Sequence, residues 1–473
     1  MNVEYILKKF KQFSFGQIFV FAIGLITIPV LTRIVSPEDM GKYSLFDTAS
    51  QLFQALVILG LDQSYIRFYN EENEKAKSKL LQVCTIISIC ALLLIGTVAV
   101  LFYKQISYFI VGKESLLIYL LLVFQVLLLI LYRFTTSQIR MNQRAILFSL
   151  LQSIQRLCYI GFAYLFFMKG NADYLILIFG CIFSYIVTVA WGIFSEKRVW
   201  ALNHKLKMRT NLKEIMMYGL PFVFTSALTW IFQSIDKVMI NLYWNYHEVG
   251  IFSGALNIVK LLNIFQSAFT ISWVPIVYEY YKKNPNNTSF YITANRIVSY
   301  IMILLSTCLI IFKDIIIHFL GDEYSQAAFV FPFLLLMPIM YTISETTSLG
   351  INFSKKSYYH VIISAIVAVC NIIGNFILVP KHGALGAAIA TGISYFVFFL
   401  LRTFISNRLF KVNYNLWSLM LSICIMYSYC FYASFHSNQF IFYAIGCITL
   451  LIHTLIFKDV IKLGWNYIQK RSN

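Results

Sequence analysis

The chain has 473 residues, of which 59% are hydrophobic, 17% aromatic and only 12% charged. A water-soluble fold cannot bury that much apolar surface, so the composition excludes a soluble globular protein and indicates a polytopic membrane protein. The formal net charge of +18 would suggest nucleic acid as a partner of a soluble chain. In a membrane protein, however, basic residues collect in cytoplasmic loops beside an anionic leaflet, so no nucleic-acid partner is expected.

About fourteen apolar stretches are long enough to cross a bilayer as helices, because roughly 20 residues at 1.5 Å per residue span about 30 Å of hydrocarbon. The sequence therefore predicts an all-α, polytopic integral membrane protein with about 14 transmembrane helices. Their approximate positions are 13–33, 43–66, 80–103, 115–137, 145–168, 172–194, 215–238, 249–278, 297–319, 326–350, 359–379, 383–404, 413–434 and 438–457.

The basic residues between these stretches alternate in abundance. On this assignment, 27 of the 38 Lys and Arg residues lie on one side of the membrane and eight on the other, while three lie within or at the edge of spans. Cytoplasmic loops carry the excess of Lys and Arg. Both termini are therefore predicted to be cytoplasmic.

Short internal repeats divide the chain into two similar halves. Asp39-Met40-Gly41, which opens the second span, recurs as Glu248-Val249-Gly250, which opens the eighth. We predict an N-terminal lobe at 1–194, a basic cytoplasmic connector at 195–214, a C-terminal lobe at 215–404, and two further helices with a cytoplasmic tail at 405–473. Parallel repeats of this kind are a transporter architecture, with the substrate site between the repeats.

Several segments resemble one known family of transporters. The segments lie in order along the chain: Leu31-Thr32-Arg33-Ile34-Val35-Ser36-Pro37, Gly60-Leu61-Asp62, Tyr218-Gly219-Leu220-Pro221-Phe222, Ser234-Ile235-Asp236-Lys237 and Val379-Pro380-Lys381-His382-Gly383. Together they resemble the Wzx-type polysaccharide flippases of the multidrug/oligosaccharidyl-lipid/polysaccharide exporter superfamily. This resemblance implies two six-helix lobes and transport of undecaprenyl-diphosphate oligosaccharides to the outer leaflet of a bacterial inner membrane, for O-antigen or capsule.

Basic residues inside spans are the first candidates for the substrate site. A charge in the bilayer core normally faces a watery cavity or a partner, and a diphosphate headgroup requires cations. Lys260 in the eighth span, Arg156 in the fifth and Arg296 at the edge of the ninth are therefore candidate headgroup ligands. A structural role, such as snorkelling or pairing with a buried acid, is the alternative for Lys260 and Arg156.

Arg33 and Asp47 form a second candidate set, because the helices that meet at the 34–42 loop can bring them together. Their placement is similar to that in lipid II flippases, whose first, second and eighth helices contribute an arginine, an aspartate and an arginine to the central cavity. In this chain the third member would be Lys260, which lacks the bidentate fork of arginine. An interfacial ion pair that clamps two helices is the alternative.

Other charged residues have both structural and functional interpretations. Asp62 and Arg67 lie at the inner end of the second span and form either a cytoplasmic gate pair or an ordinary cap and a snorkelling cation. Glu345, deep in the tenth span, is the best isolated acid for ion coupling, although neighbouring hydroxyl groups could satisfy it.

We therefore expect a transporter that works by alternating access, with no catalytic residues, no metal site and no cofactor other than possible coupling to H⁺ or Na⁺. Expected partners are the lipid-linked oligosaccharide, membrane lipids and a polymerase with its chain-length regulator. The alternatives are a lipid II-type or MATE multidrug exporter and a membrane polysaccharide polymerase or glycosyltransferase. The sequence does not identify the sugar.

Overall fold

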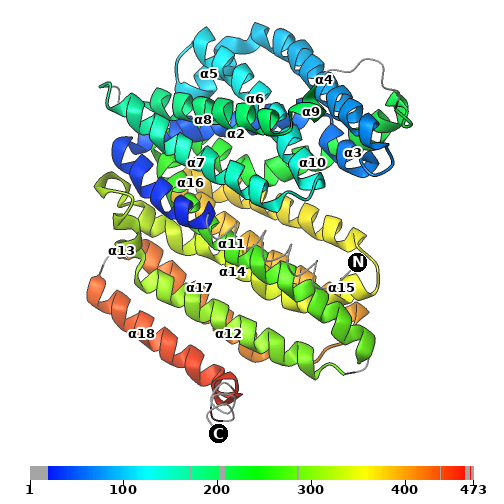
Figure 1. Ribbon diagram of the computed structural model, residues 1–473. Coiled ribbons are helices and arrows are strands. Elements are labelled where there is room, and N and C mark those ends of the chain that lie inside the picture. The colour runs from blue at the N-terminus through cyan, green and yellow to red at the C-terminus, as the bar shows by residue number, and fades with distance from the viewer. Residues whose placement is uncertain are drawn as a thin grey trace. The chain divides into compact units, whose positions relative to one another are not determined.

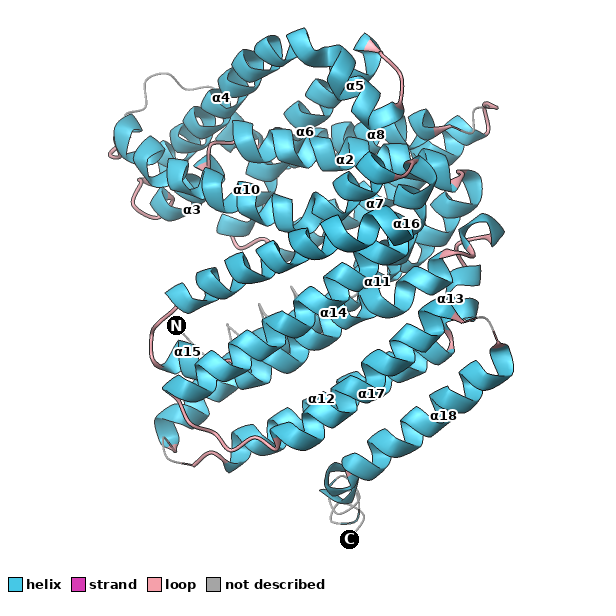
Figure 2. Cartoon of the chain, turned by 180° about the vertical axis from the view of Figure 1, so that it is seen from behind, coloured by secondary structure: helices cyan, strands magenta, loops and turns pink. Residues whose placement is uncertain are grey.

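The computed structural model describes residues 20–170, 173–201, 208–284, 287–436, 438–463 and 469, and every regular element in these ranges is helical (Figures 1 and 2). Side chains at 75, 264, 265, 268, 271, 272 and 275 are not among those described. The basic N-terminal segment 1–12, most of the first half of span 13–33, part of the connector and the last residues lie outside the described residues.

The chain divides into two compact units, Met1–Val238 (unit 1) and Met239–Asn473 (unit 2), and the boundary lies inside one helix. Unit 1 holds a helix at Val20–Ile34, α2 (Pro37–Val57), α3 (Leu61–Phe68), α4 (Glu74–Ala99), a short 3₁₀ turn (Val100–Phe102), α5 (Tyr103–Val111), α6 (Leu116–Met141), α7 (Ala145–Phe167), α8 (Tyr174–Ser195), α9 (Lys197–Trp200) and most of α10 (Leu212–Tyr243). The predicted lobe boundaries at 194 and 215 stay predictions.

Unit 2 consists of long helices joined by short connections, and α12, α14, α17 and α18 are packed in adjacent rows (Figures 1 and 2). Its elements are α11 (Tyr246–Lys283), α12 (Ser289–Ile311), α13 (Lys313–His318), a 3₁₀ turn (Asp322–Tyr324), α14 (Ala327–Thr347), α15 (Leu349–Phe353), α16 (Tyr358–Leu409), α17 (Leu416–Phe435) and α18 (Gln439–Ile456).

The repeated segments noted in the sequence open helices with the same cap. Ser36 precedes α2 and its hydroxyl accepts a hydrogen bond from the Asp39 backbone N–H, 3.2 Å away. Asn245 precedes α11 and its side chain accepts from the Glu248 N–H at 3.0 Å. A polar cap followed by an acidic first turn satisfies exposed backbone donors and complements the helix dipole. The two copies of the repeat therefore share a local structure.

Within the described residues, ten helices are long and apolar enough to cross a membrane, or eleven when the bent pair α2 and α3 is taken as one span. The multi-pass architecture is confirmed, while the number fourteen stays a prediction. One of the ten, α16, has 52 residues.

The α16 segment folds back on itself. Gly383 has a φ of 53°, which interrupts the helix. On either side of it, the Asn371 amide lies 3.3 Å from the Thr391 hydroxyl, and a Cβ on Gly386 would lie 2.4 Å from the Leu378 carbonyl oxygen. The halves are therefore antiparallel, as expected for the separate predicted spans 359–379 and 383–404.

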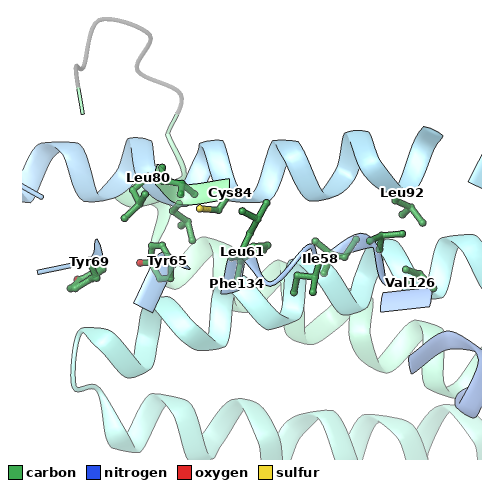
Figure 3. Packing of buried hydrophobic residues seen from close by; sticks show 13 residues of the cluster. Ile58, Leu61, Tyr65, Tyr69, Leu80, Cys84, Leu92, Val126 and Phe134 are labelled. Atoms are coloured by element: carbon green, nitrogen blue, oxygen red, sulfur yellow. The ribbon is translucent and has the colours of Figure 1, made fainter. Parts of the chain in front are cut away.

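Unit 1 has a core where α3 meets α4, α6 and the start of α10 (Figure 3). Leu61, Tyr65, Cys84 and Phe134 are among its buried members. Tyr65 also hydrogen-bonds to Gln138 of α6. Because lipid is as apolar as these side chains, dense packing and interhelical hydrogen bonds hold such helices together.

The basic connector is attached to unit 1 on both sides of residues 202–207. Before them, the Gln82 amide donates to the Ala201 carbonyl oxygen at 2.8 Å. After them, the Glu72 carboxylate accepts from the backbone N–H groups of Arg209 and Thr210 at 3.0 and 2.8 Å. These contacts fix the described ends of the connector against the ends of α3 and α4.

Candidate functional site

A polar cavity in unit 1, which we call the unit 1 cavity, has a volume of about 660 Å³. It lies between α2, α3, α6, α7, α8 and α10. Its charged lining residues are Asp47, Asp62, Arg133 and Arg140. Amide, hydroxyl and aromatic side chains make up most of the remainder, including Gln51, Gln54, Gln63, Gln152, Gln233, Thr136, Ser137, Thr225, Ser226, Thr229, Tyr132, Tyr185, Phe148, Phe222 and Trp230.

One end of the unit 1 cavity carries an ion pair between α3 and α6. Asp62 is buried, and its Oδ2 accepts from Arg133 Nη2 at 2.7 Å, from Arg133 Nε at 2.9 Å and from the Gln63 amide at 3.0 Å. The Arg133 side chain is 48% exposed. An arginine has five N–H donors, so the ion pair leaves part of the guanidinium directed to the cavity.

Arg140 lies two turns further along α6, at the same end of the cavity. It is exposed, and its guanidinium makes no ion pair or hydrogen bond with any residue that the structure describes. Arg140, which has no guanidinium partner among the described residues, lies near Arg133, which has N–H donors not used by Asp62. Two such arginines suit an anion with several oxygen atoms. We call this the cationic end of the cavity.

The walls of the cavity hold their polar groups in fixed orientations. The Gln54 amide donates to the Leu129 carbonyl oxygen at 2.9 Å, and the Trp230 indole donates to the Thr48 carbonyl oxygen at 2.9 Å. The Tyr132 and Tyr185 rings meet edge to face with centroids 5.1 Å apart. Amides offer both donors and acceptors, and aromatic rings offer apolar faces, so the walls match the mixed polar and apolar surface of a sugar.

Two of the predicted residues, Asp47 and Asp62, line this cavity. Asp47 accepts from the Gln51 amide at 2.7 Å. Arg156 is within electrostatic reach of Tyr132 and Tyr185, which line the cavity. Its Nη1 donates to the Val20 carbonyl oxygen at 2.9 Å. Arg156 thus bonds to the backbone of another helix, and its role as a headgroup ligand stays a prediction.

The two predicted pairs are not formed. Arg67 is exposed and pairs with Glu71, which follows α3 in the chain, while Asp62 pairs with Arg133. The gate pair Asp62–Arg67 is therefore wrong as a contact. Arg33 is exposed and makes no ion pair with Asp47 within the described ranges, because Asp47 lies one helix further on and its bonded partner is Gln51.

In unit 2, Arg296 has a structural partner that the sequence analysis did not anticipate. Its guanidinium pairs with Asp459 at 2.6 Å, donates to the Ser418 hydroxyl at 2.8 Å and to the Ile456 carbonyl oxygen at 3.0 Å, and lies over the Phe457 ring. Its donors are thus engaged by the start of α17 and the end of α18. Arg296 thus anchors the C-terminal helices, and its role as a headgroup ligand stays a prediction.

Glu345 is not an isolated acid. Its Oε1 lies 2.8 Å from Arg402 Nη2, and both side chains are almost fully buried. Arg402 also donates to the Ser344 and Ser348 hydroxyls at 2.8 and 3.0 Å. A role of Glu345 in ion coupling stays a prediction, and so does headgroup binding by Lys260, whose side chain is exposed on α11.

Arg133 and Arg140 are not among the predicted site residues, because basic residues such as those of the stretch 133–144 are ordinary at the predicted cytoplasmic end of a span. A signal was present. Arg133, Ser137 and Arg140 are spaced by four and three residues, which places them on one face of a helix, and α6 continues to Met141.

A sequence profile described as "Polysaccharide biosynthesis protein" matches residues 6–281, more than half of the chain. The chain belongs to this family. Among curated relatives, the Staphylococcus aureus protein "Capsular polysaccharide biosynthesis protein CapF" is 25% identical over 257 residues, which cover 52% of this chain and 63% of that one. The chain thus spans less than two thirds of that relative's length. The Haloferax volcanii "Probable low-salt glycan biosynthesis flippase Agl15" is 21% identical, covering 80% of this chain and 79% of that one.

Solved structures show which fold this family member has. A structure of "Lipid II flippase MurJ, inward closed conformation" is similar with a TM-score of 0.71 at 18% identity, over 96% of this chain and 99% of that one. An inward-facing MATE transporter has a TM-score of 0.57 at 14% identity, over 84% and 96% of the two chains. The fold expected from the resemblance to the exporter superfamily is confirmed.

Proposed function

We propose that this protein is a flippase that moves undecaprenyl-diphosphate-linked oligosaccharides from the cytoplasmic to the outer leaflet of a bacterial inner membrane by alternating access. The glycan would serve a surface polysaccharide such as O-antigen or capsule. Membership of the polysaccharide biosynthesis family and the similarity of the fold to that of the lipid II flippase support this proposal. So do the names of the two relatives, a capsular polysaccharide biosynthesis protein and a probable glycan flippase.

The observation that carries the proposal is the division of the unit 1 cavity into a cationic end and a polar wall of mostly uncharged side chains, in which Asp47 is the charged residue. A lipid-linked sugar carries its charge at the diphosphate and its hydroxyl groups beyond it. Arg140 and the exposed part of Arg133 suit the diphosphate, while the amides and aromatic rings of α2, α8 and α10 suit the sugar. A cavity for cationic drugs would instead be lined mainly by carboxylates, whereas of the two carboxylates here Asp62 is paired with Arg133 and Asp47 accepts a hydrogen bond from the Gln51 amide.

The ion pair between Arg133 and Asp62 has a role in the transport cycle. A substrate moves the equilibrium between inward- and outward-facing states only through a difference in affinity. Asp62 competes with the diphosphate for Arg133 and therefore keeps the headgroup from binding too tightly to be released. An H⁺ or Na⁺ gradient supplies direction, and a polymerase with its chain-length regulator receives the product.

The test is the flipping rate of a fluorescent lipid-linked oligosaccharide in proteoliposomes that contain the full-length protein. Arg140→Gln keeps a hydrogen-bonding side chain but removes the charge. Loss of one charge-assisted hydrogen bond, worth about 1.5–3 kcal/mol, should lower the rate about 10- to 100-fold. Arg140→Lys should recover part of it.

Arg67→Gln is the matched control, because Arg67 is an exposed arginine of the same unit that does not line the cavity. It should flip the lipid at the wild-type rate. Equal rates for Arg140→Gln and wild type would overturn the assignment of the cationic end. Transport of a cationic dye by wild type, with no movement of the lipid, would overturn the proposed function.

A further inference from the structure

A second pocket in unit 1, of about 400 Å³, is separate from the unit 1 cavity and shares no lining residue with it. Its lining residues lie at the ends of several membrane-spanning helices. Lys77 stands in the first turn of α4, Asn142 follows α6, Arg144 precedes α7 and Lys197 follows α8. Four spans thus end at this pocket, so it lies at the level of the lipid headgroups. We call it the interfacial pocket.

The charge of the interfacial pocket is positive. Its lining contains Lys77, Arg144, Lys197 and Arg198, against the carboxylates Glu74 and Glu196. Both carboxylates are occupied: Glu74 pairs with Lys77, and the buried Glu196 lies 2.8 Å from Arg144 Nη1 and accepts from the Asn142 amide at 3.1 Å.

Two cations of the pocket pair with no carboxylate of the described residues. Lys197 and Arg198 are exposed, and the side chain of neither forms an ion pair or hydrogen bond with the part of the chain that the structure describes. Lys197 Nζ lies 5.6 Å from the centre of the Phe194 ring, and this ring is 71% exposed at the end of α8. An apolar ring beside an exposed lysine, in a pocket that Arg198 also lines at the end of a span, matches the boundary between an acyl chain and a phosphate.

We propose that the interfacial pocket binds the phosphate of an anionic membrane phospholipid, such as phosphatidylglycerol, through Lys197 and Arg198, with Phe194 against the glycerol backbone and acyl chain. The predicted topology places this pocket in the cytoplasmic leaflet, where anionic lipids attract basic residues next to spans. A soluble phosphate would use the same cations but not the exposed ring. This binding is independent of the transport proposed for the unit 1 cavity.

The test measures lipid retention by the purified full-length protein in native mass spectrometry, with added phosphatidylglycerol or phosphatidylcholine of the same acyl chains. Wild type should retain phosphatidylglycerol preferentially. Because each basic residue near the surface contributes about a five-fold gain in affinity for anionic lipid, the Lys197→Gln/Arg198→Gln variant should bind about 25-fold more weakly.

The matched control is Lys113→Gln/Lys169→Gln, which removes two exposed lysines at the opposite ends of the same spans. Lys169 is a close match for Lys197, since its Nζ lies 5.9 Å from the centre of the Phe166 ring at the end of α7. The control should retain phosphatidylglycerol as wild type does. Equal losses in the two variants, or no preference for phosphatidylglycerol in wild type, would overturn the proposal.

Further measurements separate the possible ligands. Displacement of phosphatidylglycerol by millimolar inorganic phosphate, or tighter retention of undecaprenyl phosphate than of phosphatidylglycerol, would overturn the assignment to a phospholipid. In liposomes without anionic lipid, the Lys197→Gln/Arg198→Gln variant should flip lipid-linked oligosaccharide at the wild-type rate. Arg140→Gln should retain phosphatidylglycerol normally, so failure of one proposal is distinguishable from failure of the other.

Discussion

Gly60 and Gly219 lie in direct backbone contact. Gly60 joins α2 to α3 with a φ of 65°, and a Cβ at this position would lie 2.1 Å from the Gly219 carbonyl oxygen. Two segments that carry the family resemblance, Gly60-Leu61-Asp62 and Tyr218-Gly219-Leu220-Pro221, therefore meet in space. Their contact sets the bend that directs Asp62 toward the unit 1 cavity.

This contact predicts that Gly60→Ala destabilises the protein. The left-handed conformation costs a residue with a Cβ about 1–2 kcal/mol, and the overlap with Gly219 adds about 1–3 kcal/mol. We expect a lower thermal unfolding midpoint in detergent. Gly161→Ala in α7 is the control, because a Cβ there meets nothing within 4 Å. Equal midpoints for the two variants would show that the α2–α3 bend tolerates a side chain.

The buried pair Glu345–Arg402 predicts strong coupling in stability. Removing one partner leaves a buried charge unpaired and should cost about 3–5 kcal/mol, whereas replacing both with apolar residues can be nearly neutral. Glu345→Leu and Arg402→Met should each lower the unfolding midpoint, and the double variant should recover most of the loss. The exposed pair Arg67–Glu71 is the comparison, and Arg67→Gln should cost at most about 1 kcal/mol. Additive losses at 345 and 402 would contradict the coupling.

The anchor formed by Arg296 and Asp459 predicts a local effect of substitution. The hydrogen bond from Arg296 lowers the pKa of the Asp459 carboxyl and so keeps it ionised. Arg296→Gln should loosen the end of α18 and speed tryptic cleavage after Lys458 and Lys462, while lipid flipping stays within about two-fold of wild type, since about 0.4 kcal/mol corresponds to that factor. Arg296→Lys, which keeps the charge without the fork, should give intermediate cleavage. A flipping defect as large as that of Arg140→Gln would instead support Arg296 as a headgroup ligand.

The attachment of the connector predicts a dependence on pH. Burial acts to raise the pKa of Glu72, but hydrogen bonds from the N–H groups of Arg209 and Thr210 outweigh it, so the pKa lies below the usual range. A carboxyl with a lowered folded-state pKa contributes stability above its unfolded-state pKa and loses it as the pH falls through the folded value. Amide hydrogen exchange at Arg209 and Thr210, corrected for its intrinsic rate, should be slow above about pH 5 and accelerate below about pH 4.

Glu72→Gln should make these two amides exchange faster at neutral pH, because a neutral acceptor forms weaker hydrogen bonds than a carboxylate. Glu71→Gln is the control, since Glu71 pairs with Arg67 on the surface instead. Unchanged exchange in Glu72→Gln would show that other contacts hold this end of the connector.

Hydropathy predicted a multi-pass helical protein and where most of its long apolar helices lie, because a helix that crosses a bilayer needs a long apolar stretch. It could not predict which helices are neighbours. Asp62 is held by Arg133 of α6, Glu345 by Arg402 of α16 and Arg296 by Asp459 beyond α18. Each pair depends on packing between segments far apart in sequence, whereas the predicted partners were chosen from nearby residues.

The same limit explains which site residues were found. Asp47 and Asp62 stood out as acids in apolar spans, and both line the unit 1 cavity. Arg140 lies in a basic stretch at the end of a span, where a positive residue is ordinary. Only the structure shows that it lines the unit 1 cavity together with Arg133, whereas Arg144 of the same segment lines the second pocket.

The antiparallel folding of α16 has a consequence for how the chain is made. A straight helix of 52 residues would be about 78 Å long, more than twice the hydrocarbon thickness. The halves around Gly383 contact each other closely, and Gly386 lies against the backbone at Leu378. Almost no chain remains between them to form a hydrophilic loop. The two halves therefore suit entry into the membrane together as one hairpin, in which each half covers part of the other.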